Sequence, residues 1–166
     1  MTTEWLTTDQ QRAWRSYLLG MTLLMERLDR DLRSRHDVSL PEYEMLVRLS
    51  ESPDRSLRMA ELADAVKNSR SRVTHTIARM ERAGLVHRHS CPSDGRGVVA
   101  TLTDHGYATL VKAAPDHVAS VQSALVSVVS DEDLQAIGRA FAAVADGLTA
   151  GEPDPVLAAN AAVSRG

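Results

Sequence analysis

Two basic segments in the middle of the chain carry the side chains best suited to chemistry. Residues 68–83 are rich in arginine, serine and threonine, and residues 91–97 run Cys-Pro-Ser-Asp-Gly-Arg-Gly. Arginine can donate two hydrogen bonds at once to guanine or phosphate, and hydroxyl groups can form hydrogen bonds with base edges or phosphates. A basic helix followed by a basic turn has a shape that suits the two grooves of a DNA duplex. We therefore predict a DNA-binding site within residues 59–103.

The helical part of this site is predicted from its periodicity. With Val73, Ile77 and Met80 turned inward, the opposite face holds guanidinium, hydroxyl and imidazole groups and no carboxylate. The residues predicted to contact DNA are Ser69, Arg70, Ser71, Arg72, Thr74, His75 and Arg79, with Asp94 and Arg96 from the turn. For the helix alone, a solvated charged surface is the alternative.

The turn strengthens the prediction. Asp94-Gly95 permits a tight reversal and places Arg96 at its tip, where a narrow minor groove would attract it. Asp94 can orient Arg96 through an ion pair, or it can serve only as a turn residue.

The charge distribution agrees with this location. The whole chain has a net charge of -3, which by itself argues against nucleic acid. Residues 55–98, however, hold nine basic and four acidic side chains and so carry about +5, leaving about -8 for the remainder. We expect the basic block to form the binding face.

These segments must be positioned by a set of helices and one hairpin. Apolar periodicity predicts helices near 9–35, 40–50, 59–66, 69–83, 104–128 and 131–148, with strands at 85–90 and 98–102. Capping boxes are expected at Thr8 with Gln11 and at Ser39 with Glu42, and Gly84 is placed to end the fourth helix. The predicted fold class is mainly α with a small β-hairpin (α+β).

The terminal helices are too apolar to stand alone in water. Leu19 and Leu23 widen the apolar face of the first helix beyond one stripe, which points to a partner chain. In the long helix after Thr103, the stripe expected to face inward is Leu110, Val111, Ala114, Val118, Val121, Leu125 and Val128. Pro115 should bend this helix without ending it.

Several motifs resemble the MarR (multiple antibiotic resistance regulator) family of winged-helix regulators. They are residues 57–64, Ser69–Thr74, Met80–Val86, Asp94–Gly97 and Leu102–Gly106, and the resemblance covers about residues 10–148. It implies an obligate homodimer with intertwined terminal helices. It also implies a recognition helix in the major groove and a wing in the minor groove of a near-palindrome. Many such proteins are repressors released by a small anionic, often phenolic, ligand.

The resemblance gives a domain plan and a candidate effector site. Residues 1–37 would form an N-terminal dimerisation helix, 38–102 the winged helix-turn-helix lobe, 103–148 the C-terminal dimerisation helices and 149–166 a flexible tail. The candidate effector pocket comprises Trp14, Tyr17, Met21, Met25 and Tyr43, although such a stripe is more often plain core. A two-fold dimer predicts half-sites about one helical turn apart.

A metal or redox site near the turn is the less favoured interpretation. His87, His89 and Cys91 alternate, so a straight strand would point two imidazoles and a thiolate the same way. Their spacing matches no familiar zinc signature and a fourth ligand is missing, so we expect no metal and no cofactor. Cys91 lies outside the N-terminal helix that carries the sensing cysteine in peroxide-sensing relatives, so we expect an unreactive thiol.

Other classes of protein lack support in the sequence. The single cysteine fits a reducing compartment, and we find no signal peptide and no apolar run of the roughly 20 residues that span a membrane. Phosphate loops, nucleophile elbows and H-E-x-x-H motifs are missing, so we do not expect an enzyme. The sequence predicts a soluble, cytoplasmic DNA-binding regulator; the alternative is a winged-helix protein-interaction module that does not bind DNA.

Overall fold

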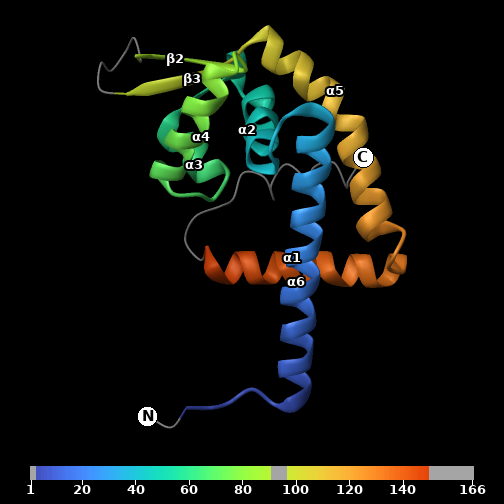
Figure 1. The fold of residues 1–166 in the computed structure, drawn as a ribbon. Helices are drawn as coiled ribbons and strands as arrows, with labels where there is room; N and C mark the ends of the chain where they lie inside the picture. Colours follow the sequence, from blue (N-terminus) through green and yellow to red (C-terminus); the bar gives the residue numbers. More distant parts are fainter. Residues whose placement is uncertain (1–2, 91–96, 150–166) are drawn as a thin grey trace. The chain divides into compact units, whose positions relative to one another are not determined.

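A computed structural model describes residues 3–90 and 97–149 of the chain, and these are mostly helical (Figure 1). In chain order the elements are α1 (Thr8–His36), α2 (Leu40–Glu51), the 3-10 turn η1 (Pro53–Arg55), β1 (Ser56–Arg58), α3 (Met59–Ala65), α4 (Arg70–Arg82), β2 (Val86–Ser90), β3 (Val98–Leu102), α5 (Asp104–Val121), the π-helical segment η2 (Gln122–Val126) and α6 (Asp131–Leu148). Residues 1–121 form one unit and residues 122–166 a second, and each is considered separately. This architecture confirms the predicted fold class.

The core of the first unit lies among α2, α3, α4 and the sheet, with α1 and α5 contributing one end each. Its fully buried side chains include Leu46, Leu49, Leu62, Val73, Ile77 and Met80. Because α4 gives three residues of one face to this core, its opposite face must point outward. The core therefore fixes which side of α4 is available to a partner.

The sheet has three antiparallel strands in the order β1-β3-β2. Strands β2 and β3 pair from Val86 with Leu102 to Ser90 with Val98, as the predicted hairpin requires. Strand β1 was not predicted: Ser56, Leu57 and Arg58 pair with Thr101, Ala100 and Val99 in a segment expected to be loop or helix start. The extra strand anchors the hairpin to the start of α3.

The ends of the helices follow local capping chemistry. The box at Ser39 and Glu42 is confirmed, as is the left-handed Gly84 with φ 72°. The first box was predicted one residue too late. Thr7, not Thr8, is the cap of α1, and its partner is Gln10, not Gln11, because their side chains and backbone amides bond reciprocally.

The contact between α1 and α5 is polar at its rim. Nε2 of His36 lies 2.8 Å from Oδ2 of Asp116, and Nη1 of Arg35 donates to Oδ1 of the same carboxylate at 3.3 Å. The hydroxyl of Ser120 donates to Oδ2 of Asp31 at 2.9 Å. Each pair joins one helix to the other. They hold the C-terminal half of α1 along α5.

The inward stripe predicted for the long helix is corrected by the structure. Leu110 is buried, but Val111 and Val118 are exposed in the single chain, and the buried face instead holds Gly106, Ala113 and Ser120. The reason is close approach: a Cβ at Gly106 would lie 2.1 Å from the carbonyl oxygen of Leu85. Helix α5 continues through Pro115, as expected.

Among the described residues, no helix combines the length and apolarity that crossing a membrane would require.

Candidate nucleic-acid interface

Helix α4 presents the predicted basic face to solvent. Val73, Ile77 and Met80 are fully buried, which confirms the orientation expected from the sequence. The seven residues on this helix and its cap that were predicted to contact DNA are all exposed: Ser69, Arg70, Ser71, Arg72, Thr74, His75 and Arg79. No acidic residue lies in the first turn.

The N-terminus of α4 is ordered by its own side chains. The hydroxyl of Ser69 accepts from the amide of Arg72 at 3.3 Å, and Asn68 accepts from the amide of Ser69 at 3.0 Å. The hydroxyl of Thr74 donates a hydrogen bond to the carbonyl oxygen of Arg70 at 2.8 Å. Within the described parts of the chain, Arg70 and Arg72 have no ion-pair partner, so their charge adds to the positive end of the helix dipole.

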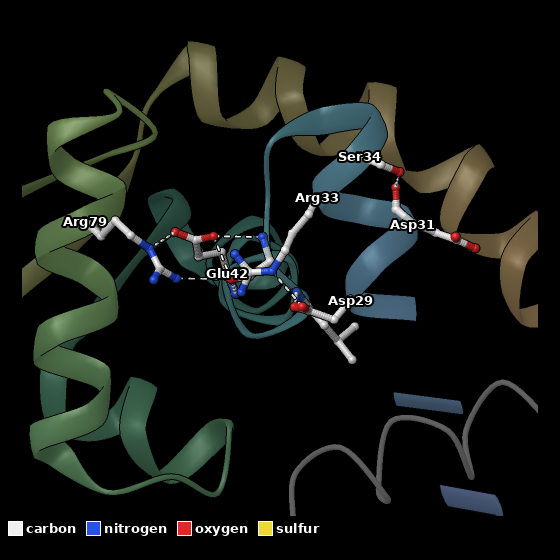
Figure 2. Close-up of polar contacts among 8 residues, drawn as sticks. Asp29, Asp31, Arg33, Ser34, Glu42 and Arg79 are labelled. Atoms are coloured by element: carbon white, nitrogen blue, oxygen red, sulfur yellow. Dashed lines mark hydrogen bonds and ion pairs between the residues drawn. The ribbon is translucent and has the colours of Figure 1, made fainter. Parts of the chain in front are cut away.

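Arg79 is placed differently from the other arginines of this face. Its Nε donates to Glu42 at 2.6 Å and its Nη2 donates to Ser39 at 3.2 Å, so the guanidinium bends toward α2 (Figure 2). The side chain is still 52% exposed. The sequence pattern correctly placed Arg79 on the outward face but missed this partner, which lies 37 positions earlier in the chain.

An ion pair that the sequence analysis missed joins the hairpin to α4. The backbone amide and the Nε of Arg88 donate to Glu81 at 2.9 Å and 2.8 Å. Hydrogen bonds from Arg88 hold the pKa of Glu81 below its ordinary value, so this carboxylate stays charged. The base of the hairpin is thereby fixed beside the recognition helix, while Asp94 and Arg96 lie outside the described residues.

A groove of about 360 Å³ runs between the start of α3, the start of α4 and the hairpin. It is lined by Arg58, Met59, Ala60, Arg70, Thr74, Arg88, Gly97 and Val98. Three of these side chains are guanidinium groups and none is a carboxylate. The groove can therefore receive a polyanion such as a phosphate backbone.

Of the three residues considered for a metal or thiol site, the structure describes only His87 and His89. The rings of His87 and His89 are exposed and stack with centroids 6.0 Å apart, and Cys91 lies outside the described residues. In the ranges 3–90 and 97–149 there is no group of three residues arranged to hold a metal ion.

The five residues of the candidate effector pocket divide into two places. Trp14 and Tyr17 lie with ring centroids 5.6 Å apart on α1, where Trp14 is half exposed. Met21 and Met25 continue this stretch of α1 and are partly exposed. Tyr43 is instead buried in α2, 4.5 Å from the ring of His117.

His117 was not singled out by the sequence analysis. Its Nδ1 is buried and has no hydrogen-bond partner among the described residues, and burial lowers the pKa of the ring. A neutral imidazole therefore lies next to Tyr43, at the boundary between the core and α5.

Comparisons with known proteins agree with this geometry. Residues 38–98, which hold α2 to the start of β3, match the model of the MarR family. The DNA-bound crystal structure of Sco3205, a MarR family regulator from Streptomyces coelicolor, is 44% identical, covers 92% of this chain and 96% of its own, and superposes with a TM-score of 0.87. The chain belongs to the MarR family.

Two further relatives of this MarR protein support the assignment. AbsC, a MarR family transcriptional regulator from Streptomyces coelicolor, is 44% identical over 88% of this chain and 98% of its own, with a TM-score of 0.82. The HTH-type transcriptional regulator PecS of Dickeya dadantii (strain 3937) is 26% identical over 117 residues, which is 70% of each chain. The protein is thus a winged-helix transcriptional regulator, and its relatives are regulators, not enzymes.

Proposed function

We propose that this MarR protein binds a near-palindromic operator as a homodimer. In each subunit α4 would lie in the major groove and the β2–β3 hairpin would reach the minor groove. The observation that carries the proposal is the basic face of α4, whose Arg70 and Arg72 have no neutralising partner in the described chain. The DNA complex of the 44% identical Sco3205 supports it.

The DNA contacts are assigned to two groups of residues. The first group would contact base edges and nearby phosphates, and it comprises Ser69, Arg70, Ser71, Arg72, Thr74 and His75. From the turn, Arg96 would enter the minor groove with Asp94 as its orienting residue. For Arg79, a different role is argued below.

Dimerisation is assigned to the terminal helices. Leu18, Leu19, Leu23 and Trp14 of α1 are between 44% and 62% exposed in one chain, which is unusual for a contiguous apolar face. In the second unit, Ile137, Phe141, Val144 and Leu148 of α6 are likewise 39–82% exposed. A second copy would cover both faces, with residues 1–37 and 103–148 as dimerisation segments and 38–102 as the DNA-binding lobe.

We further assign the protein as a cytoplasmic repressor that a small anionic ligand releases from DNA. Trp14, Tyr17, Met21 and Met25 of α1 would line the ligand site in the dimer, while Tyr43 of α2, buried against His117, would lie apart from them in the single chain. Ligand binding there would act on the DNA-binding lobe by favouring one arrangement of the helices.

Selection of bound duplexes from random DNA tests this proposal. The expected product is a sequence with two related half-sites whose centres lie about 10 base pairs, or a multiple, apart. Enrichment of no sequence, or of a single unrepeated half-site bound by one subunit, would contradict it. Screening phenolic and other small organic anions for release of the selected duplex then tests the effector.

A further inference from the structure

A chain of polar contacts connects three helices of the first unit through the start of α2 (Figure 2). It begins at Arg33 and Asp29 of α1, passes the capping box of Ser39 and Glu42, and ends at Arg79 of α4. Neither end lies in the core, but its middle is buried, since Ser39 is 1% and Glu42 is 6% exposed. The recognition helix is therefore joined to α1 by buried polar groups.

The contacts of Glu42 account for both of its oxygens. Oε1 accepts from Nε of Arg79 at 2.6 Å, and Oε2 accepts from the backbone amide and the hydroxyl of Ser39 at 2.8 Å and 2.6 Å. Nη2 of Arg79 donates to the same Ser39 hydroxyl at 3.2 Å. The guanidinium thus forks across two members of the box, a geometry that the single ammonium of lysine cannot reproduce.

The other side of α2 is held by α1. Oδ1 of Asp29 accepts from the backbone amide of Leu40 at 2.9 Å, and Oδ2 accepts from Nε of Arg33 at 2.6 Å. Leu40 is the first residue of α2 and follows the cap directly. A movement of α1 near Asp29 would therefore displace the same turn that binds Arg79.

Electrostatics make this arrangement sensitive to the loss of one partner. Burial alone would raise the pKa of Glu42, but hydrogen bonds from Arg79 and Ser39 outweigh it, so the pKa lies below its ordinary value. Removing the arginine leaves a buried carboxylate with its charge unpaired. Arg79 is the only member of this cluster that belongs to α4 among the described residues.

We propose that Arg79 is a positioning residue, which sets the recognition helix against the Ser39–Glu42 capping box and, through Asp29, against α1. It would act on operator affinity without touching DNA. This inference rests on the proposed function for its effect on DNA, whereas the coupling between α4 and α2 can be measured in the free protein. It connects α1, the helix proposed above to bind the effector, to α4 through the first turn of α2.

The test compares Arg79→Lys, Arg79→Ala, Glu42→Gln and the double variant Arg79→Lys with Glu42→Gln in full-length protein. Glutamine keeps the box, because its carbonyl accepts from Ser39, but it removes the charge that pairs with Arg79. Lysine keeps the positive charge for a phosphate but loses the fork. Arg82→Ala, three positions further along α4 and without an ion pair in the described chain, is the matched control.

For DNA binding, Arg79→Lys and Glu42→Gln should each lose about tenfold in affinity for the selected duplex. The double variant should lose no more affinity than the single variant that binds less tightly. The slope of log K against log salt should stay at the wild-type value in all of them, including Arg79→Ala, which removes the positive charge. An Arg79 that contacts phosphate predicts the opposite pattern. Glu42→Gln would then bind normally, and Arg79→Ala would lower the slope by about 0.9 per subunit.

Hydrogen exchange in the free protein separates this inference from the proposed function. Amides of the last turns of α4 and the first turn of α2 should exchange faster in Glu42→Gln and Arg79→Lys than in wild type and Arg82→Ala. Unchanged exchange would overturn the positioning role whether or not DNA binds. If wild type binds no duplex while exchange rises as expected, the proposed function fails but the coupling of the helices stands.

Discussion

At the residue scale, the arginines of α4 differ in what surrounds their guanidinium groups. Arg79 lies 2.6 Å from the buried Glu42, whereas Arg70 and Arg72 have no ion-pair partner in the described chain. A charge already held by a nearby carboxylate contributes little extra attraction to phosphate. The arginines of α4 without a carboxylate partner in the described chain are therefore Arg70 and Arg72 at its N-terminus and Arg82 in its last turn.

Arg72 offers a direct check of this division. Arg72→Ala should weaken binding to the selected duplex by about 1–3 kcal/mol per half-site while leaving thermal stability unchanged, because the side chain is exposed and unpaired. Fluorescence anisotropy and calorimetry measure the two effects. Arg30→Ala, an equal loss of charge on an exposed part of α1, serves as control and should bind normally.

The carboxylate of Glu42 predicts a pH dependence of stability. Its folded-state pKa lies below the ordinary 4.5, so its stabilising effect is complete above about 4.5 and is lost as the pH falls through the lower folded value. The difference in free energy of unfolding between wild type and Glu42→Gln should accordingly shrink between pH 6 and pH 3. Chemical denaturation at several pH values measures it, and a constant difference would contradict the ion pair.

At the element scale, the sequence predicted those features that depend on neighbouring residues. Capping boxes, the buried face of α4 and the turn at Gly84 involve partners within a few positions, and all but the first cap were placed correctly. Strand β1 was missed because its three residues form a strand only by pairing with β3, more than 40 positions later. Its pattern alone carried no signal.

The candidate site was predictable to the same extent. Periodicity identified the exposed face of α4 and the hairpin beside it, because both follow from local geometry. The ion pairs of Arg79 with Glu42 and of Arg88 with Glu81 depend on how separate elements pack. A single sequence shows many arginines and glutamates, and it does not say which of them meet.

The inner face of α5 shows the same limit in an apolar setting. The prediction followed the largest side chains, but the tight contact with the turn before β2 selects Gly106, where a Cβ would meet the Leu85 carbonyl and the Leu102 side chain. Large residues such as Val111 and Val118 are left exposed in one chain. Small residues at a close contact contribute little to the apolar periodicity of a sequence. The large apolar residues that remain exposed contribute more, so they determined the prediction.

This close contact gives a prediction about folding. Gly106→Ala should destabilise the protein by about 2–4 kcal/mol, because backbone atoms of Leu85 must move to admit the methyl group. The midpoint of denaturant unfolding measures the loss. Gly20→Ala in α1, where nothing lies within 4 Å, should instead be neutral or stabilise by up to about 1 kcal/mol. Equal effects at both sites would contradict the packing described.

At the scale of the whole molecule, opposite charges are separated along the chain. The segment 55–98 carries about +5 although the whole chain carries -3. Such a distribution attracts DNA to one face and repels it from the rest, so it favours a productive orientation on encounter. Net charge alone would have hidden the site.

The exposed leucines of α1 give a prediction about assembly. Leu19→Asp with Leu23→Asp should convert a dimer to monomers, because these side chains are 62% and 56% exposed in one chain and would be buried against a second copy. Analytical ultracentrifugation measures the mass. Val98→Asp, which changes an equally apolar exposed residue of the hairpin, should leave the dimer intact. Monomeric wild-type protein would refute the assembly proposed.

The most direct test of the central claim is a titration of duplex DNA with the full-length protein at a series of salt concentrations. Several unpaired arginines per subunit on phosphates predict a steep, linear fall of log K with log salt, about 0.9 for each phosphate contact. A winged-helix module that binds only other proteins would show no such binding to duplex DNA. No binding to any duplex at low salt, or affinity independent of salt, would contradict the account.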